Sequence, residues 1–232
     1  MKKLLTKELL KLKGPSPLKN EYKESLKLSK EQRCILVGTL LGDAHLEPKG
    51  IDAYRYYFCQ KDSQEDYVKH IHNWFQDWCS TDPAYSKTGL DKEGKITRSC
   101  YFRTCTHPSF RFYANQFYEK GMKGKRTKKV PKLLHKWLTP RALAYWFMDD
   151  GCRDKYSYIL NTQNFTLKEQ EVLADALGRK FKFQVNIHKD RDTYRLYITS
   201  NSRDSLTNVI KPFILPSFEY KLHKTLKKII SP

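Results

Sequence analysis

The pattern of hydrophobic and polar positions predicts a chain in which two buried helices are set among short strands. The helices predicted at 30–43 and 140–150 are apolar over most of their length, which is typical of helices covered on nearly every side. Residues 64–79 instead carry a single apolar stripe, so they predict an amphipathic helix. The chain therefore has the pattern of a globular protein with a substantial core.

Strands are predicted where apolar and polar residues alternate with a period of two. The alternating segments are 53–59, 98–105, 156–162, 183–189 and 193–199. The last two flank a short polar sequence and predict a β-hairpin. Further helices are predicted at 108–120, 166–181 and 203–213.

Polar residues mark where three of these helices begin. Ser29 and Thr139 are predicted N-caps, and Pro140 occupies the first helical position after Thr139. Thr166 and Glu169 have the spacing of a capping box.

The same order of elements occurs twice, which predicts two related halves. Each copy begins with an apolar helix that ends at an acid, Asp43 in the first and Asp150 in the second. The predicted divisions are a basic arm with a short helix at 1–28, a first half at 29–120, a basic linker at 121–138 and a second half at 139–232 with a basic C-terminal helix.

The charge balance favours a polyanionic partner. The 232 residues include 44 Lys and Arg against 25 Asp and Glu, a net charge of +19 that is spread over most segments. Self-repulsion of this size disfavours the compact state unless a polyanion neutralises it. A lysine-rich surface without such a partner is the alternative.

The cysteines and histidines do not indicate a zinc site. None of the six cysteines forms a C-x-x-C pair, and His70 and His72 are two residues apart, so we expect them on different faces of their helix, at or near the surface. No apolar run has the length of a signal peptide or membrane span, so an intracellular protein with reduced thiols and no membrane partner is expected.

The two terminal acids indicate a cation site. Apolar helices that pack side by side would bring their carboxylates together, where like charges and the partial negative charge of two helix C-termini repel. A divalent cation relieves that repulsion, and oxygen ligands suit magnesium or calcium. Beside a basic surface, such a site would suit hydrolysis of phosphodiesters. Taken singly, each helix could equally be a core helix whose last residue reaches water.

The two helix ends resemble a known motif. The sequences LVGTLLGDA at 36–44 and LAYWFMDDG at 143–151 resemble the two copies of the LAGLIDADG motif of single-chain homing endonucleases, and the second copy is similar to the omega-intron endonuclease subgroup. The first copy departs from the motif in ending at Ala44 and in having Leu41 at the sixth position. The second has Tyr145 at the third position.

The resemblance implies an α+β fold of two pseudosymmetric αββαββα halves. The halves would pack through the two motif helices, and their antiparallel sheets would form a saddle over DNA. The resemblance implies that the acid at the eighth motif position binds the metal, and this position falls on Asp43 and Asp150. Ala44 and Gly151, which follow them, are further predicted ligands. Asp149 occupies the variable seventh position. Mg²⁺ is the expected cofactor, with Mn²⁺ or Ca²⁺ as ions that the same site accepts.

The resemblance also implies basic residues near each metal. Similarity to the family's basic segment before a proline selects Lys128, with Lys129 as a neighbouring DNA contact, and similarity to its YKL sequence selects Lys221. Each lysine could instead contact a phosphate. Gln60 and Gln163 are candidates for contacts around the acids.

DNA contacts are expected on the strands, since alternation leaves one face of each sheet for polar residues. The basic loop at 120–129 is expected to add phosphate contacts. The candidates are Arg55, Lys61, Arg98, Arg103, Lys125, Lys129, His188, Arg195 and Tyr197. An exposed strand face carries polar residues in any protein, so the group is more informative than any one member.

The leading hypothesis is a monomeric, magnesium-dependent homing endonuclease that cleaves both strands of a long double-stranded DNA site. The alternative is a maturase that binds intron RNA and assists splicing, because this fold is used for both; a DNA-binding protein without cleavage is a third reading. The composition fits a protein encoded in a mitochondrion or chloroplast, and a bacterial or archaeal source fits as well.

Overall fold

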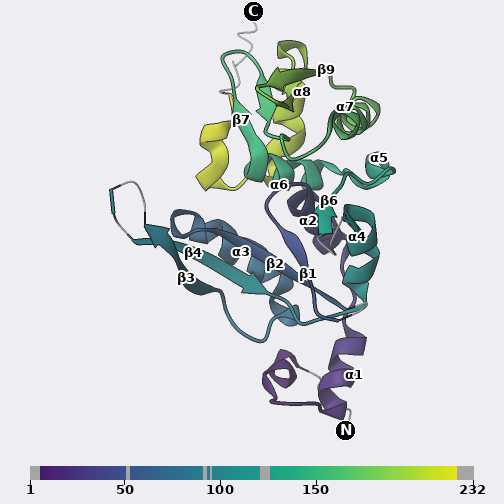
Figure 1. The fold of residues 1–232 in the computed structure, drawn as a ribbon, viewed down its shortest axis with the longest axis vertical. Coiled ribbons are helices and arrows are strands. Elements are labelled where there is room, and N and C mark those ends of the chain that lie inside the picture. Colours follow the sequence, from purple (N-terminus) through teal and green to yellow (C-terminus); the bar gives the residue numbers. More distant parts are fainter. Residues whose placement is uncertain (1–5, 51–52, 91–92, 95, 121–125, 224–232) are drawn as a thin grey trace, which may run out of the picture. The chain divides into compact units, whose positions relative to one another are not determined.

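The computed structural model describes residues 6–50, 53–90, 93–94, 96–120 and 126–223 and divides into two compact units, Met1–Thr127 and Lys128–Pro232 (Figure 1). The division falls inside the stretch expected to be a linker. Lys125 lies outside the described residues, and so do residues 224–232, which include most of the expected basic C-terminal helix.

The first unit begins with the short helices η1 (Lys7–Lys11) and α1 (Pro17–Ser25). Its main part contains α2 (Lys30–Leu41), β1 (His45–Pro48), β2 (Tyr54–Lys61), η2 (Asp62–Gln64), α3 (Glu65–Phe75), η3 (Gln76–Trp78), β3 (Ala84–Leu90), β4 (Ile96–Arg103) and α4 (Ser109–Phe117). The strands β5 (Tyr118–Lys120) and β6 (Arg126–Lys128) form a separate small sheet.

The second unit begins with the single-turn helix α5 (Leu134–Trp137). It continues with α6 (Pro140–Asp150), β7 (Gly151–Arg153), β8 (Tyr158–Leu160), α7 (Leu167–Phe181), β9 (Val185–Asp190), β10 (Thr193–Ile198), α8 (Ser200–Ile210), η5 (Lys211–Phe213) and η6 (Pro216–Lys221). Val130, Leu134 and Leu138 are buried, so this part of the expected linker is packed rather than loose.

The two units share one topology. Each runs helix, strand, strand, helix, strand, strand, helix, and each has a four-stranded antiparallel sheet, of order β1-β2-β4-β3 in the first and β7-β8-β10-β9 in the second. The α+β class and the αββαββα order of both halves are therefore confirmed.

The predicted caps start the helices as expected. Ser29 Oγ accepts from the Gln32 backbone N–H at 3.1 Å while Gln32 Oε1 accepts from Ser29 N–H at 2.9 Å, which closes a capping box. Thr139 Oγ1 accepts from Ala142 N–H at 3.1 Å. The box predicted for Thr166 is also present.

The helix α2 ends earlier than expected, at Leu41 rather than Asp43. Gly42 is its C-cap, and the Ala44 N–H donates to Thr39 O at 2.8 Å across the turn that follows. Asp43 consequently lies in that turn and not on the helix.

The first sheet has one covered and one open face. The helix α3 packs along β2 and β4 (Figure 1). On β2, Tyr54, Tyr56 and Phe58 are buried, and the residues that alternate with them are partly exposed. On β4, Arg98 has the parity of the buried Cys100 and Phe102, so it lies on the helix side of the sheet. The expectation that Arg98 shares the open face with Arg103 is wrong, because the two are an odd number of residues apart.

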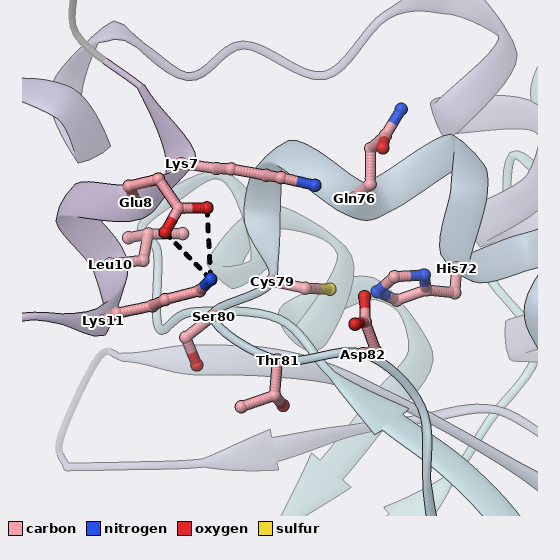
Figure 2. A pocket seen from close by; sticks show the side chains of 10 residues that line it. All are labelled: Lys7, Glu8, Leu10, Lys11, His72, Gln76, Cys79, Ser80, Thr81 and Asp82. Carbon is pink, nitrogen blue, oxygen red and sulfur yellow. Dashed lines mark hydrogen bonds and ion pairs between the residues drawn. The ribbon is translucent and has the colours of Figure 1, made fainter.

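His72 also departs from the sequence analysis. It is 6% exposed rather than at the surface, and its ring packs edge-on against Phe102 with centroids 5.4 Å apart. It borders a cavity of about 540 Å³ between η1 and the end of α3, beside Cys79 and Asp82 (Figure 2). Burial lowers the pKa of this imidazole below its ordinary value, so the ring is a neutral part of the core.

We expect acid to destabilise the first unit partly through His72. Because its pKa is lower in the folded chain than in the unfolded chain, the stabilisation that it provides is present above about pH 6.5 and is lost as pH falls below that value. His72→Phe keeps an aromatic ring against Phe102 and removes the titration. Urea unfolding at pH 7.5 and 5.5 should show a smaller acid-induced loss for the variant; an equal loss in both proteins would contradict this role.

Candidate nucleic-acid interface and acid sites

The first acid, Asp43, is exposed in the turn after α2. Its Oδ2 accepts a hydrogen bond from Gln60 Nε2 at 2.6 Å, while the adjacent Ala44 is fully buried. Gln60 lies on the same face of β2 as the buried Tyr56 and Phe58, and its amide reaches the turn that follows α2. The structure thus brings together two residues that sequence reasoning had placed near one site.

The second acid, Asp150, is the last residue of α6 and is half-buried. Its backbone carbonyl accepts from the Asn161 N–H at 2.9 Å and from Asn161 Nδ2 at 3.0 Å. Asn161 was not among the predicted site residues. It lies one residue past β8, where an amide in an otherwise apolar strand end was the available signal.

Gln163 does not repeat the arrangement of Gln60. Its Nε2 donates to Asp190 Oδ2 at 2.9 Å, which ties it to the end of β9. The register of the hairpins pairs His45 with Tyr57 and Cys152 with Ile159, so Thr162 is the counterpart of Gln60. Thr162 is buried and donates to Gln170 Oε1 at 2.6 Å.

Lys221 lies against the C-terminal end of α6. Its Nζ donates to the carbonyl of Met148 at 2.6 Å and is 3.4 Å from that of Asp149, and it sits 5.3 Å from the centre of the Phe218 ring. Carbonyls in the last turn of a helix lack intrahelical partners, and a cation there also offsets the helix dipole. Lys221 therefore lies against the backbone of the two residues that precede Asp150.

Lys128 and Lys129 are half-buried at the end of β6 and directly after it. The backbone is fixed close by, since the Val130 N–H donates to Glu169 Oε1 at 3.0 Å. Glu169 thereby serves both the cap of α7 and the segment that carries the two lysines.

The open face of the first sheet carries a cluster of charged and aromatic residues. Arg103 lies 4.6 and 4.7 Å from the ring centres of Tyr57 and Tyr101. Glu47 accepts from Arg55 Nε at 2.5 Å and from Arg103 Nε at 3.4 Å. Partial burial alone would raise the pKa of the Glu47 carboxyl, but these two arginines hold it below its ordinary value. Lys61, at the end of β2, is exposed on the same face.

On the open face of the second sheet, the residues predicted to contact DNA lie on β9 and β10. His188 is exposed and its ring stacks on Tyr197 with centroids 4.5 Å apart, while Arg195 is half-buried and 4.0 Å from Asp190. Arg195 pairs with His188 across the hairpin. Six of the nine residues expected to contact DNA thus lie on these open faces: Arg55, Lys61, Arg103, His188, Arg195 and Tyr197.

In the part of the chain that the structure describes, no group of three or more His, Cys, Asp or Glu side chains is placed to hold an ion. None of the helices within the described ranges is long and apolar enough to cross a membrane.

These features define the class of protein: two α+β units of one topology, each with a carboxylate at or just beyond the end of a buried helix and a sheet with an open face of arginine and aromatic residues. The chain belongs to the LAGLIDADG DNA endonuclease family, whose model matches residues 33–206. The family resemblance of the two sequence motifs is confirmed. Family membership supports a site-specific DNA endonuclease as the class of enzyme.

Two endonucleases and a maturase are among the known proteins that are similar to the chain. The homing endonuclease I-WcaI, in a structure bound to its DNA recognition sequence, has a TM-score of 0.85 at 28% identity and covers 96% of this chain and 100% of its own. A probable intron-encoded endonuclease of Wickerhamomyces canadensis is 29% identical over 93% of this chain and 94% of its own length. The cytochrome b mRNA maturase bI2 of Saccharomyces cerevisiae is 35% identical over 81% of this chain, which spans 46% of the maturase.

Gly151 is required by close packing at the second acid. A Cβ at this position would lie 2.3 Å from Phe147 Cδ2 and 2.5 Å from the Phe147 carbonyl oxygen. We expect Gly151→Ala to destabilise the protein by about 1–3 kcal/mol, as overpacked cores do. Thermal unfolding would measure the change.

Gly178→Ala is the matched control. Gly178 lies inside α7, and the nearest atom to its added Cβ would be 3.6 Å away. Alanine favours a helix interior over glycine by about 0.5–1 kcal/mol, so this variant should be as stable as the parent or more so. Equal destabilisation by both substitutions would rule out the packing account of Gly151.

Proposed function

We propose that the protein is a homing endonuclease that hydrolyses both strands of a long, specific double-stranded DNA site. The observation that carries the proposal is the repetition of one αββαββα unit in which an acid lies at or just beyond the end of a buried helix and a sheet has an open face of arginine and aromatic residues. I-WcaI, whose structure is bound to its DNA recognition sequence, supports duplex DNA as the partner. Each sheet would read one half-site, through arginine contacts to guanine edges and backbone contacts from the lysines.

Asp43 and Asp150 are the residues that we propose to hold a divalent cation, with Ala44 and Gly151 next to them. The donor set fits such an ion because both acids supply hard oxygen ligands, and Gln60 already orients the Asp43 carboxylate through its amide. Mg²⁺ is the proposed ion, with Mn²⁺ or Ca²⁺ as substitutes. When bound, it would activate water and stabilise charge on the phosphate.

The lysines would complete the site. We propose that Lys221 and Lys128 polarise the attacking water or hold the phosphate, and that Lys129 and Lys125 contact the DNA backbone. The position of the Lys221 ammonium against the carbonyl of Met148 supports a role close to Asp150. The same contact also makes Lys221 a cap of α6.

We propose that this endonuclease acts as a monomer in an organelle. A single chain carries both acids, so we propose that no second copy is needed. The intron-encoded endonuclease and the cytochrome b maturase among the relatives support a mitochondrial or chloroplast source.

A maturase function remains the second candidate because the relative with 35% identity is named a cytochrome b mRNA maturase. The basic open faces suit intron RNA as well as duplex DNA. Affinities for a cognate duplex and for folded intron RNA, compared at one salt concentration, would separate the two functions.

A cleavage selection tests the leading function. The protein would be incubated with a pool of duplexes and Mg²⁺, and the cut sites sequenced, for the parent and for Asp43→Asn and Asp150→Asn. We expect one long site cut by the parent and at least a hundredfold slower cleavage by each variant, because a ligand carboxylate is lost. Tight, salt-sensitive RNA binding with no cut site would favour the maturase.

Lys221→Met tests whether this lysine acts in cleavage or only caps α6. If it acts in proton transfer or phosphate stabilisation, cleavage at saturating enzyme should fall by a hundredfold or more while duplex affinity changes little. If it only caps the helix, thermal stability should fall and the cleavage rate of the folded variant should stay near that of the parent.

A further inference from the structure

The open face of the first sheet contains an acid where a polyanion is expected to bind. Glu47 lies on β1, directly across from Arg55 of β2, and its side chain is 20% exposed. A carboxylate on such a surface repels phosphate, so its presence calls for a compensating role.

Each of the two arginines donates its Nε–H to one carboxylate oxygen of Glu47. Its Oε2 accepts from Arg55 Nε at 2.5 Å and its Oε1 from Arg103 Nε at 3.4 Å. The guanidinium of Arg103 is further held within 4.7 Å of the ring centres of Tyr57 and Tyr101. One carboxylate therefore sets the orientation of two guanidiniums that come from different strands.

This arrangement leaves a defined edge of each guanidinium for a ligand. A guanidinium has five N–H donors in a rigid plane, and the one on Nε is directed at Glu47. The four N–H groups on the terminal amino nitrogens are those able to make a bidentate contact with the O6 and N7 atoms of guanine. An arginine held in advance also loses less conformational entropy when it binds.

Stability alone is a poor account of the cluster. The side chains of Arg55 and Arg103 are 26% and 37% exposed. Ion pairs at such positions contribute about 0–1 kcal/mol to the free energy of unfolding. A cavity of about 200 Å³ borders both arginines, together with Tyr101 and Asp82. In a complex with DNA, this is the side from which a base edge would approach the two arginines.

We propose that Glu47 is a specificity-determining residue that positions Arg55 and Arg103 to read guanines in the half-site bound by the first unit. The inference rests on the proposed function, since it requires the open sheet face to contact duplex DNA. Glu47 contacts no base itself and acts through the two arginines.

Glu47→Gln tests the proposal, with Glu21→Gln as the matched control. Glutamine keeps the size of the side chain and loses its charge. Glu21 is exposed on α1, so the control makes the same change in net charge away from the sheet. Cleavage by the parent and both variants would be measured on the selected target and on all its single base-pair substitutions, together with thermal stability.

The expected result separates positioning from charge. Both variants lose one negative charge and should bind all duplexes somewhat more tightly. Only Glu47→Gln should lose discrimination, by at least about fivefold, the lower end of one bidentate arginine–guanine contact, and only at guanines of one half-site.

Other outcomes overturn the proposal in distinguishable ways. If Glu47→Gln and Glu21→Gln give the same substitution profile, Glu47 has no part in specificity, and a lower thermal stability of Glu47→Gln alone would then mark it as a structural residue. If the parent selects no specific duplex site, the proposed function fails and the role of Glu47 fails with it.

Discussion

The fold depends on placing an acid at or just beyond the end of each buried helix without leaving the helix carbonyls unsatisfied. A helix C-terminus already carries partial negative charge, and its last carbonyls have no intrahelical partners. In the second unit Asn161 and Lys221 donate to carbonyls of the last turn of α6. In the first, the Ala44 N–H closes the turn on Thr39. Each solution comes from elements that the αββαββα order places at that end.

The two acids are therefore held differently although their units share a topology. Asp43 is exposed beyond its helix and its carboxylate is oriented by Gln60. Asp150 is half-buried on its helix, and its backbone is fixed by Asn161. Under the proposed function, the two equivalent strands of a duplex would meet two unlike acid environments.

Much of the fold was predictable because it depends on local signals. The apolar helices, the caps of Ser29 and Thr166 and the β9–β10 hairpin all follow from residues close in sequence. The errors have physical reasons. The prediction for Arg98 was wrong because strand parity puts it on the helix side of β4, and His72 is buried because its ring packs against Phe102 of the sheet. The role of Glu47 depends on Arg103, 56 residues away, which no local pattern indicates; Asn161 left only a weak signal, an amide at the end of an apolar strand.

The crowding at Gly151 has a consequence for how the two copies diverge. Any side chain there meets the Phe147 ring and backbone, whereas the matching position of the first copy accommodates Ala44 in a turn that has already left its helix. At this motif position the first copy therefore accommodates the methyl group of alanine, whereas the second has no space for it. The departure of the first copy from the motif at Ala44 thus follows from the turn that holds this residue, in which the backbone has already left the helix.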